Sequence, residues 1–122
     1  MENTQIVIDK YYQCLNDKSE YWKGMWSSDG VFSDASLTLH AEGKEAVIAS
    51  FTPFLKGVSE VSIDKRIIQD NNCCYVVCYT YVNKNRDSLQ QSVAEVWQVE
   101  GSKLKRLTIY FDLTAYRSFM QG

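Results

Sequence analysis

Residues 73–82 read CCYVVCYTYV, a run of β-branched and aromatic side chains with no charged residue. This composition predicts a β-strand. Three comparable runs accompany it, namely VSIDKRIIQ (61–69), SVAEVWQV (92–99) and KLKRLTIYF (103–111), and the segments DNN, NKNRDS and EGS between them have turn composition. Because successive strands joined by short loops pair antiparallel, the second half of the chain is expected to form a four-stranded antiparallel meander.

The N-terminal segment has a helical pattern instead. Its apolar residues fall at spacings of three and four between residues 3 and 15, and Asn3 or Thr4 is available as the N-cap. Tyr11 lies near the middle of the apolar face and Tyr12 lies toward its edge. Tyr11 is therefore the tyrosine expected to point inward.

Two more helices are expected before the meander. A short one begins at Ser19 and ends before the turn Asp29-Gly30, which leads into a short strand through Asp34. After a candidate second strand, LTLH, the segment GKEAVIASFTPFL (43–55) repeats apolar residues at helical spacing, and Pro53 limits its last turn. Helices followed by a meander predict a single α+β domain over residues 1–122.

Charge and cysteine usage exclude several function classes. The 13 basic and 15 acidic residues give a net charge of −2 and are scattered along the chain, so no nucleic-acid partner is expected. No apolar run approaches the ~20 residues of a membrane span, which predicts a soluble, cytoplasmic protein without membrane contact. The four cysteines have no disulfide or zinc spacing and His40 is the only histidine, so reduced thiols and no metal or cofactor are expected.

Two acidic residues interrupt apolar strand faces. Asp34 shares a face with Phe32, and Glu95 lies on the bulky face that also carries Val93 and Trp97. A carboxylate in apolar surroundings has a raised pKa unless hydrogen bonds stabilise its charge, and such acids serve as general bases or as neutral hydrogen-bond donors. The alternative for each acid is an exposed strand end or a structural hydrogen bond.

The order of these elements resembles the nuclear transport factor 2-like superfamily. The resemblance rests on the helix pair, SDGVFSDAS (28–36), the GKEAV helix, the four strands with the EGSKL turn, and the ending IYFDLTAYRSFM. It runs from about Asn3 to Met120, and the SnoaL-like polyketide cyclases and ketosteroid isomerases are the most similar branch. The resemblance implies a curved antiparallel sheet packed on N-terminal helices in a cone-shaped, cystatin-like α+β barrel. It also implies a pocket at the open end and a homodimer formed through the outer sheet face.

The resemblance assigns roles to the residues singled out above. Asp34 matches the general-base aspartate of the isomerases, Tyr11 their oxyanion-hole tyrosine, and Glu95 their second oxyanion-hole acid. Glu95 replaces an aspartate, and Trp26 and Phe51 stand where the isomerase pocket carries tyrosines, so steroid isomerisation itself is not implied. The expected pocket walls are Trp22, Trp26, Phe51, Trp97, Ile109 and Phe111.

The resulting interpretation is a SnoaL-like pocket protein for a small, largely apolar molecule. If it is an enzyme, it is a cofactor-independent isomerase, cyclase or hydrolase in which Asp34 removes a proton next to a carbonyl while Tyr11 and protonated Glu95 stabilise the enolate. The alternative is a non-catalytic ligand-binding or dimerisation module of the same fold. Because CCYVVCYTYV is apolar on both faces, its tyrosine face, with Tyr110, is predicted to lie outside at the dimer interface.

Overall fold

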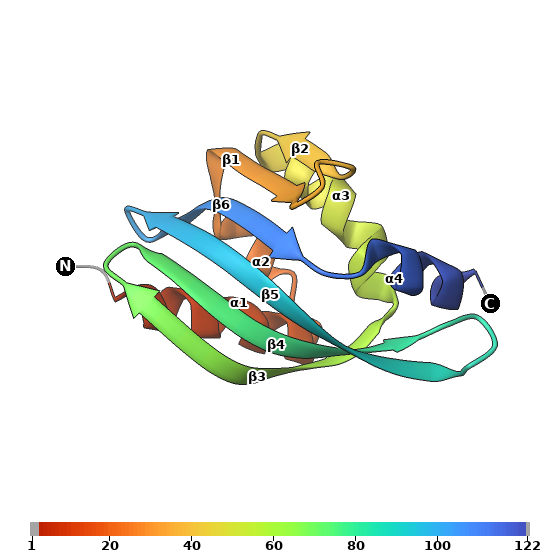
Figure 1. The fold of residues 1–122 in the computed structure, drawn as a ribbon. Helices are drawn as coiled ribbons and strands as arrows, with labels where there is room; N and C mark the ends of the chain where they lie inside the picture. Colours follow the sequence, from red (N-terminus) through yellow and green to blue (C-terminus); the bar gives the residue numbers. More distant parts are fainter. Residues whose placement is uncertain (1–2, 122) are drawn as a thin grey trace.

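The computed structural model describes residues 3–121 and contains one six-stranded sheet with four helices (Figure 1). The helices are α1 (Thr4–Asp17), α2 (Tyr21–Gly24), α3 (Lys44–Lys56) and α4 (Leu113–Met120). The strands are β1 (Trp26–Asp34), β2 (His40–Glu42), β3 (Val58–Gln69), β4 (Asn72–Val82), β5 (Ser88–Glu100) and β6 (Lys103–Tyr110). Within residues 3–121, no helix is long and apolar enough to cross a membrane.

The strand order β2-β1-β6-β5-β4-β3 confirms the predicted α+β class. The meander β3 to β6 is antiparallel as predicted, whereas β1 joins β6 in parallel and makes the sheet mixed. The sheet is curved and open, with α1 against the meander and α3 beside β1 (Figure 1). Helices on one face of a curved sheet bury that face and leave the other exposed.

Helix α1 is capped at both ends, and near its C-terminus it is hydrogen-bonded to the sheet. The Asn3 side chain accepts a hydrogen bond from the Ile6 N–H, and Lys18 ends the helix in the left-handed region with φ 58°. Asn16 donates to the Val61 carbonyl and accepts from the Val61 N–H, both at 2.8 Å, and so satisfies backbone groups of the edge strand β3. These contacts hold the tyrosines of α1 against the sheet.

Strand β1 begins earlier than the sequence analysis predicted. Helix α2 ends at Gly24, and Trp26 already belongs to β1. The pair Asp29-Gly30 does not stop a helix; it lies within the strand, where the register against β6 shifts between Trp26 and Val31. A Cβ at Gly30 would come within 2.8 Å of the Trp26 ring, so the glycine permits this bulge to pack closely.

The orientation predicted for β4 is wrong. Its tyrosine face, Tyr75, Val77, Tyr79 and Tyr81, is buried inside the curved sheet, and Cys74, Val76 and Cys78 face outward, half-buried. The inward tyrosines fill the concave space with large rings, and each hydroxyl has a partner: Asp9 for Tyr75, Glu95 for Tyr79 and Gln91 for Tyr81. Tyr110 does lie outside, as predicted, and is half-exposed.

Candidate functional site

The strand register places the two predicted acids in one row. Ile109 of β6 pairs with Asp34 of β1 on one side and with Glu95 of β5 on the other. Paired residues of neighbouring strands point to the same face, so both acids share the concave face with Ile109 between them. Adjacent strands lie about 4.8 Å apart, which puts the Cα atoms of the two acids roughly 10 Å from each other.

Glu95 is completely enclosed and lies in a hydrogen-bonded network. Tyr12 donates to its Oε1 at 2.5 Å, and the Tyr79 hydroxyl lies 3.0 Å from both carboxyl oxygens. The Trp97 indole N–H in turn donates to the Tyr12 hydroxyl at 3.0 Å. Burial raises the pKa of Glu95 to about 7, and the bonds from Tyr12 and Tyr79 lower it in part. Near neutral pH the carboxyl group can therefore both donate and accept a proton.

Tyr11 points inward, as predicted, but Tyr12 is equally buried and holds the hydrogen bond to Glu95. The rings of Tyr11 and Tyr12 meet edge to face at 5.3 Å, and Tyr11 also contacts the Trp97 ring at 4.8 Å. Residues next to each other in a helix are separated by only ~100° of rotation, so both fit a wide buried face. Tyr79 was missed as a partner of Glu95 because its strand face was assigned to the outside.

Asp34 has a different environment from Glu95. Its carboxylate accepts hydrogen bonds from the Ser36 hydroxyl at 2.5 Å and from the Leu39 N–H at 2.8 Å, which stabilises the turn between β1 and β2. Burial would raise the pKa of Asp34, but the bonds from Ser36 and from backbone N–H groups outweigh it, and the pKa is lowered. Asp34 is thus an anion at neutral pH, whereas Glu95, on the other side of Ile109, is partly protonated.

An apolar cavity of about 240 Å³, here called the mouth cavity, opens over Ile109. Phe32 and Leu39 line it from the β1 side, Phe51 and Phe54 from α3, and Phe111, Leu113, Tyr116 and Arg117 from the C-terminal segment. Phe54 also contacts the Tyr79 ring at 5.3 Å, so Phe54 and Ile109 separate the cavity from Glu95. A cavity lined mainly by aromatic and aliphatic side chains with a few polar residues is typical of small-molecule sites.

Asp34 lines a second, more polar cavity of about 390 Å³, here called the turn cavity. The turn cavity shares Phe111, Leu113 and Arg117 with the mouth cavity, so the two adjoin. Asp34 and Glu95 do not both line any of the three cavities described here. Glu95 lines none of these three cavities and Asp34 lines only the turn cavity, so the two acids lie on opposite sides of Ile109 and do not share a cavity.

The other predicted wall residues divide between cavity and core. Phe51, Ile109 and Phe111 line the mouth cavity as predicted. Trp26 and Trp97 instead pack in the core with their rings 5.8 Å apart, and Trp22 lines a separate cavity. The Trp26 indole N–H is buried and has no hydrogen-bond partner among residues 3–121, a cost of about 1–3 kcal/mol for a donor left unpaired.

Groups that bind metals are not gathered in this site. Within residues 3–121, no three histidine, cysteine or acidic side chains lie close enough together to hold a metal ion. The four cysteines are free thiols in this structure, and burial raises the pKa of Cys73 to about 12. The site therefore consists of carboxyl, hydroxyl and aromatic groups.

A scan against protein-family models finds no match, and neither does a search of the curated proteins. Solved structures do match. An NTF2-like protein from Burkholderia pseudomallei is 14% identical with a TM-score of 0.84, over 100% of both chains. A protein from Jannaschia sp., provisionally named a SnoaL-like polyketide cyclase, is 11% identical with a TM-score of 0.83, over 98% of this chain and 92% of that one.

A third match is RV0760c from Mycobacterium tuberculosis, solved in complex with estradiol-17beta-hemisuccinate. It is 14% identical with a TM-score of 0.81, over 91% of this chain and 95% of that one. The likeness at these identities is one of fold. It confirms the nuclear transport factor 2-like fold that the order of elements indicated.

The free energy of unfolding is expected to fall as the pH rises from about 4.5 to about 7. Glu95 has a pKa of about 7 when folded, against an ordinary value of 4.5, so in this range the folded state binds a proton that the unfolded state lacks. The contribution is complete below pH 4.5, is lost through pH 7, and amounts to about 3 kcal/mol. Urea unfolding at successive pH values measures it. In the Glu95→Gln variant this change in the free energy of unfolding between pH 4.5 and pH 7 should be absent. A wild-type protein that also lacked it would contradict the raised pKa of Glu95.

Tyr12→Phe is expected to raise the pKa of Glu95 above its wild-type value of about 7. The hydrogen bond from Tyr12 lowers that pKa, and removing the hydroxyl removes its stabilisation of the charged form. Tyr11→Phe is the matched control, because Tyr11 is equally buried and is not a hydrogen-bond partner of Glu95. Titration of the Glu95 carboxyl carbon by NMR measures this pKa in both variants. A larger rise in Tyr11→Phe than in Tyr12→Phe would show that Tyr11, not Tyr12, stabilises the charged form.

Proposed function

We propose that the protein binds a small, largely apolar carbonyl compound in the mouth cavity. The observation that carries the proposal is the buried network of Glu95, Tyr12 and Tyr79 behind an apolar cavity. An aromatic and aliphatic lining favours an apolar ligand, and the few polar residues that line the cavity, Ser50, Tyr116 and Arg117, can fix its orientation. The steroid ester bound by RV0760c shows that a protein of the same fold accepts a ligand of this kind.

We further propose that the site transfers a proton next to the carbonyl. A ligand over Ile109 would lie between an anionic Asp34 and a Glu95 that is partly protonated at neutral pH. Two carboxyl groups whose pKa values are separated by their environments suit a base and a hydrogen-bond donor, respectively. Asp34, from the adjoining turn cavity, would remove the proton, and protonated Glu95 would donate to the oxygen that becomes negative once the Phe54 ring moves aside and opens the wall between them.

The second candidate function is binding without catalysis. Asp34 already accepts two hydrogen bonds in the β1–β2 turn, and Phe54 and Ile109 lie between Glu95 and the mouth cavity. A base engaged in this way is weakened, since the same bonds that lower its pKa lower its affinity for a substrate proton. A pocket that only binds its ligand needs neither acid.

Helix α4 controls access to the mouth cavity in this proposal. The Tyr116 ring packs against Phe54 at 5.5 Å and against Tyr81 at 4.9 Å, and no residue of α4 is fully buried. Figure 1 shows α4 lying beside the end of α3, next to the open end of the sheet. A helix with few buried contacts can detach at small cost in free energy, which would admit a ligand larger than the cavity.

We also propose a homodimer formed through the outer face of the sheet. Three large apolar side chains are exposed on this face: Ile67 at 59%, Tyr110 at 50% and Val96 at 38%. The half-buried Cys74 and Val76 lie between them on β4, so the strip continues from β3 to β6. The four free thiols support a reducing compartment, and we place the protein in the cytoplasm.

Proton transfer is expected to appear as exchange of the α-hydrogens of a bound ketone with D₂O, followed by NMR with 3-cyclohexenone and aryl ketones as probes. Asp34→Asn should slow exchange by about 100-fold or more while the ketone still binds, because the base is lost and the shape is kept. Glu95→Gln should slow it less, since the amide still donates a hydrogen bond. Asp64→Asn, an exposed acid on β3, is the control.

The outcomes separate the candidate functions. Binding with exchange that depends on Asp34 supports catalysis, and binding with no exchange above the solvent rate supports the non-catalytic pocket. If no apolar carbonyl compound shifts the methyl resonances of Leu39, Ile109 and Leu113, the proposed ligand class is wrong.

The dimer is expected to have twice the 14.1 kDa mass of the chain in sedimentation at micromolar concentration. Val96→Glu should give a monomer, because a charge is placed in the middle of the outer apolar strip. Leu37→Glu is the matched control, since Leu37 is 70% exposed in the β1–β2 turn and away from the sheet face. A wild-type protein that sediments at 14.1 kDa would refute the dimer.

A further inference from the structure

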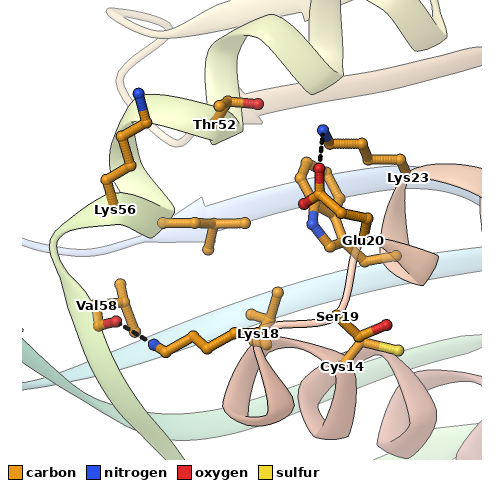
Figure 2. Close-up of a pocket in the computed structure, with 11 residues that line it drawn as sticks. Cys14, Lys18, Ser19, Glu20, Lys23, Thr52, Lys56 and Val58 are labelled. Atoms are coloured by element: carbon orange, nitrogen blue, oxygen red, sulfur yellow. Dashed lines mark hydrogen bonds and ion pairs between the residues drawn. The ribbon is translucent and has the colours of Figure 1, made fainter.

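A third cavity, of about 360 Å³, lies where the ends of α1 and α3 meet α2 (Figure 2). It shares no lining residue with the mouth cavity or the turn cavity. Lys18, Lys23 and Lys56 line it, and it is here called the lysine cavity. Its volume is in the range of small-molecule pockets, so it is a separate place where a ligand could bind.

The inner wall of the lysine cavity is apolar. Leu15 comes from α1, Trp22 from α2, Leu55 from α3 and Val58 from β3. The Trp22 side chain is almost fully buried, and its ring is held edge to face against Phe51 at 6.3 Å. Only the small exposed part of the indole can therefore contact a ligand, together with the aliphatic side chains around it.

Charge at the lysine cavity has the opposite sign to that of the whole chain. Three lysines and one acid, Glu20, line it, whereas the chain carries a net charge of −2. Lys18 and Lys56 also lie at the C-terminal ends of α1 and α3, where the helix dipoles favour cations. The dipoles explain why lysines are found there, but they do not explain the apolar surface between them.

The ammonium groups retain unused hydrogen-bond donors. Lys18 Nζ donates to the Val58 carbonyl at 2.6 Å, and Lys23 Nζ pairs with Glu20 at 2.6 Å (Figure 2). Lys56 makes no hydrogen bond or ion pair with the residues that the structure describes, so its three donors are available. An anion reaching Lys56 and Lys23 would meet donors that need no rearrangement of the core.

We propose that the lysine cavity binds a small organic anion, specifically an aromatic carboxylate. The aromatic ring lies against Trp22, Leu55 and Val58, and the carboxylate accepts hydrogen bonds from Lys56 and Lys23. The apolar surface selects for the ring, and the ammonium groups select for the charge, so neither a simple inorganic anion nor a neutral aromatic compound fits both parts. This site is independent of the mouth cavity and of any reaction there.

The test uses 2-naphthoate and its neutral analogue 2-naphthamide as probes, with binding followed by methyl NMR on the whole chain. Naphthoate is expected to shift the methyl resonances of Leu15, Leu55 and Val58, while naphthamide binds more weakly. Lys56→Gln should weaken naphthoate binding roughly threefold, and the Lys23→Gln, Lys56→Gln pair about tenfold, as expected for partly exposed charges. The matched control replaces Lys65 and Lys84, two exposed lysines elsewhere, with Gln and should change nothing.

Three results would overturn the proposal. Equal affinity for naphthamide would show that charge is not recognised. Unchanged affinity in the Lys23, Lys56 double variant would show that these lysines do not hold the carboxylate. Shifts confined to Leu39, Ile109 and Leu113 would place the probe in the mouth cavity, a result that would leave the function proposed for that cavity intact.

Discussion

The hydrogen bonds to the buried Glu95 carboxyl group tie the helical layer to the sheet. Glu95 belongs to β5, and its partners come from α1 (Tyr12) and β4 (Tyr79), so the three elements must dock in one register to satisfy it. A buried polar group without partners costs about 1–3 kcal/mol, and a buried charge costs more. Displacing α1 by one residue would move Tyr12 away and leave the acid with Tyr79 as its one remaining side-chain partner among those described. The network that fixes how α1, β4 and β5 dock therefore also keeps an ionisable group in the protein interior.

The two acids differ because the backbone near them differs. Asp34 is at the end of β1, where the chain turns and exposes N–H groups that stabilise a carboxylate. Glu95 lies in the middle of β5, where the backbone donors are committed to the sheet and only side-chain hydroxyls remain. A strand end therefore favours the anion and a strand centre favours the neutral acid. The separation of their pKa values follows from the positions of the two residues along the strands.

The sequence predicted the elements well because their patterns are periodic. Period-two runs located the meander, and the alternation of SVAEVWQV was enough to identify Glu95 as an acid on an apolar face. CCYVVCYTYV was assigned the wrong face because both of its faces are apolar, so alternation alone could not choose between them. The inward face is decided by hydroxyl partners on other elements, such as Asp9 for Tyr75, and those pairings are not visible along the chain. The sequence did not predict the lysine cavity for the same reason: its lining residues come from two segments, near residue 18 and near residue 56, that meet only in the folded chain.

The open end of the curved sheet explains why the C-terminal segment folds over the mouth cavity. Aromatic side chains gather at this end of the molecule: Phe54 from α3, Tyr81 from β4 and Phe111 directly after β6. Tyr116 of α4 contacts all three and reduces their exposure to water. Phe54 and Phe111 also line the mouth cavity, so in the proposed function a ligand there would contact two of the rings that Tyr116 contacts. A ligand larger than the cavity would have to displace Tyr116 from these rings, so the contacts that hold α4 in place would lower the affinity for such a ligand.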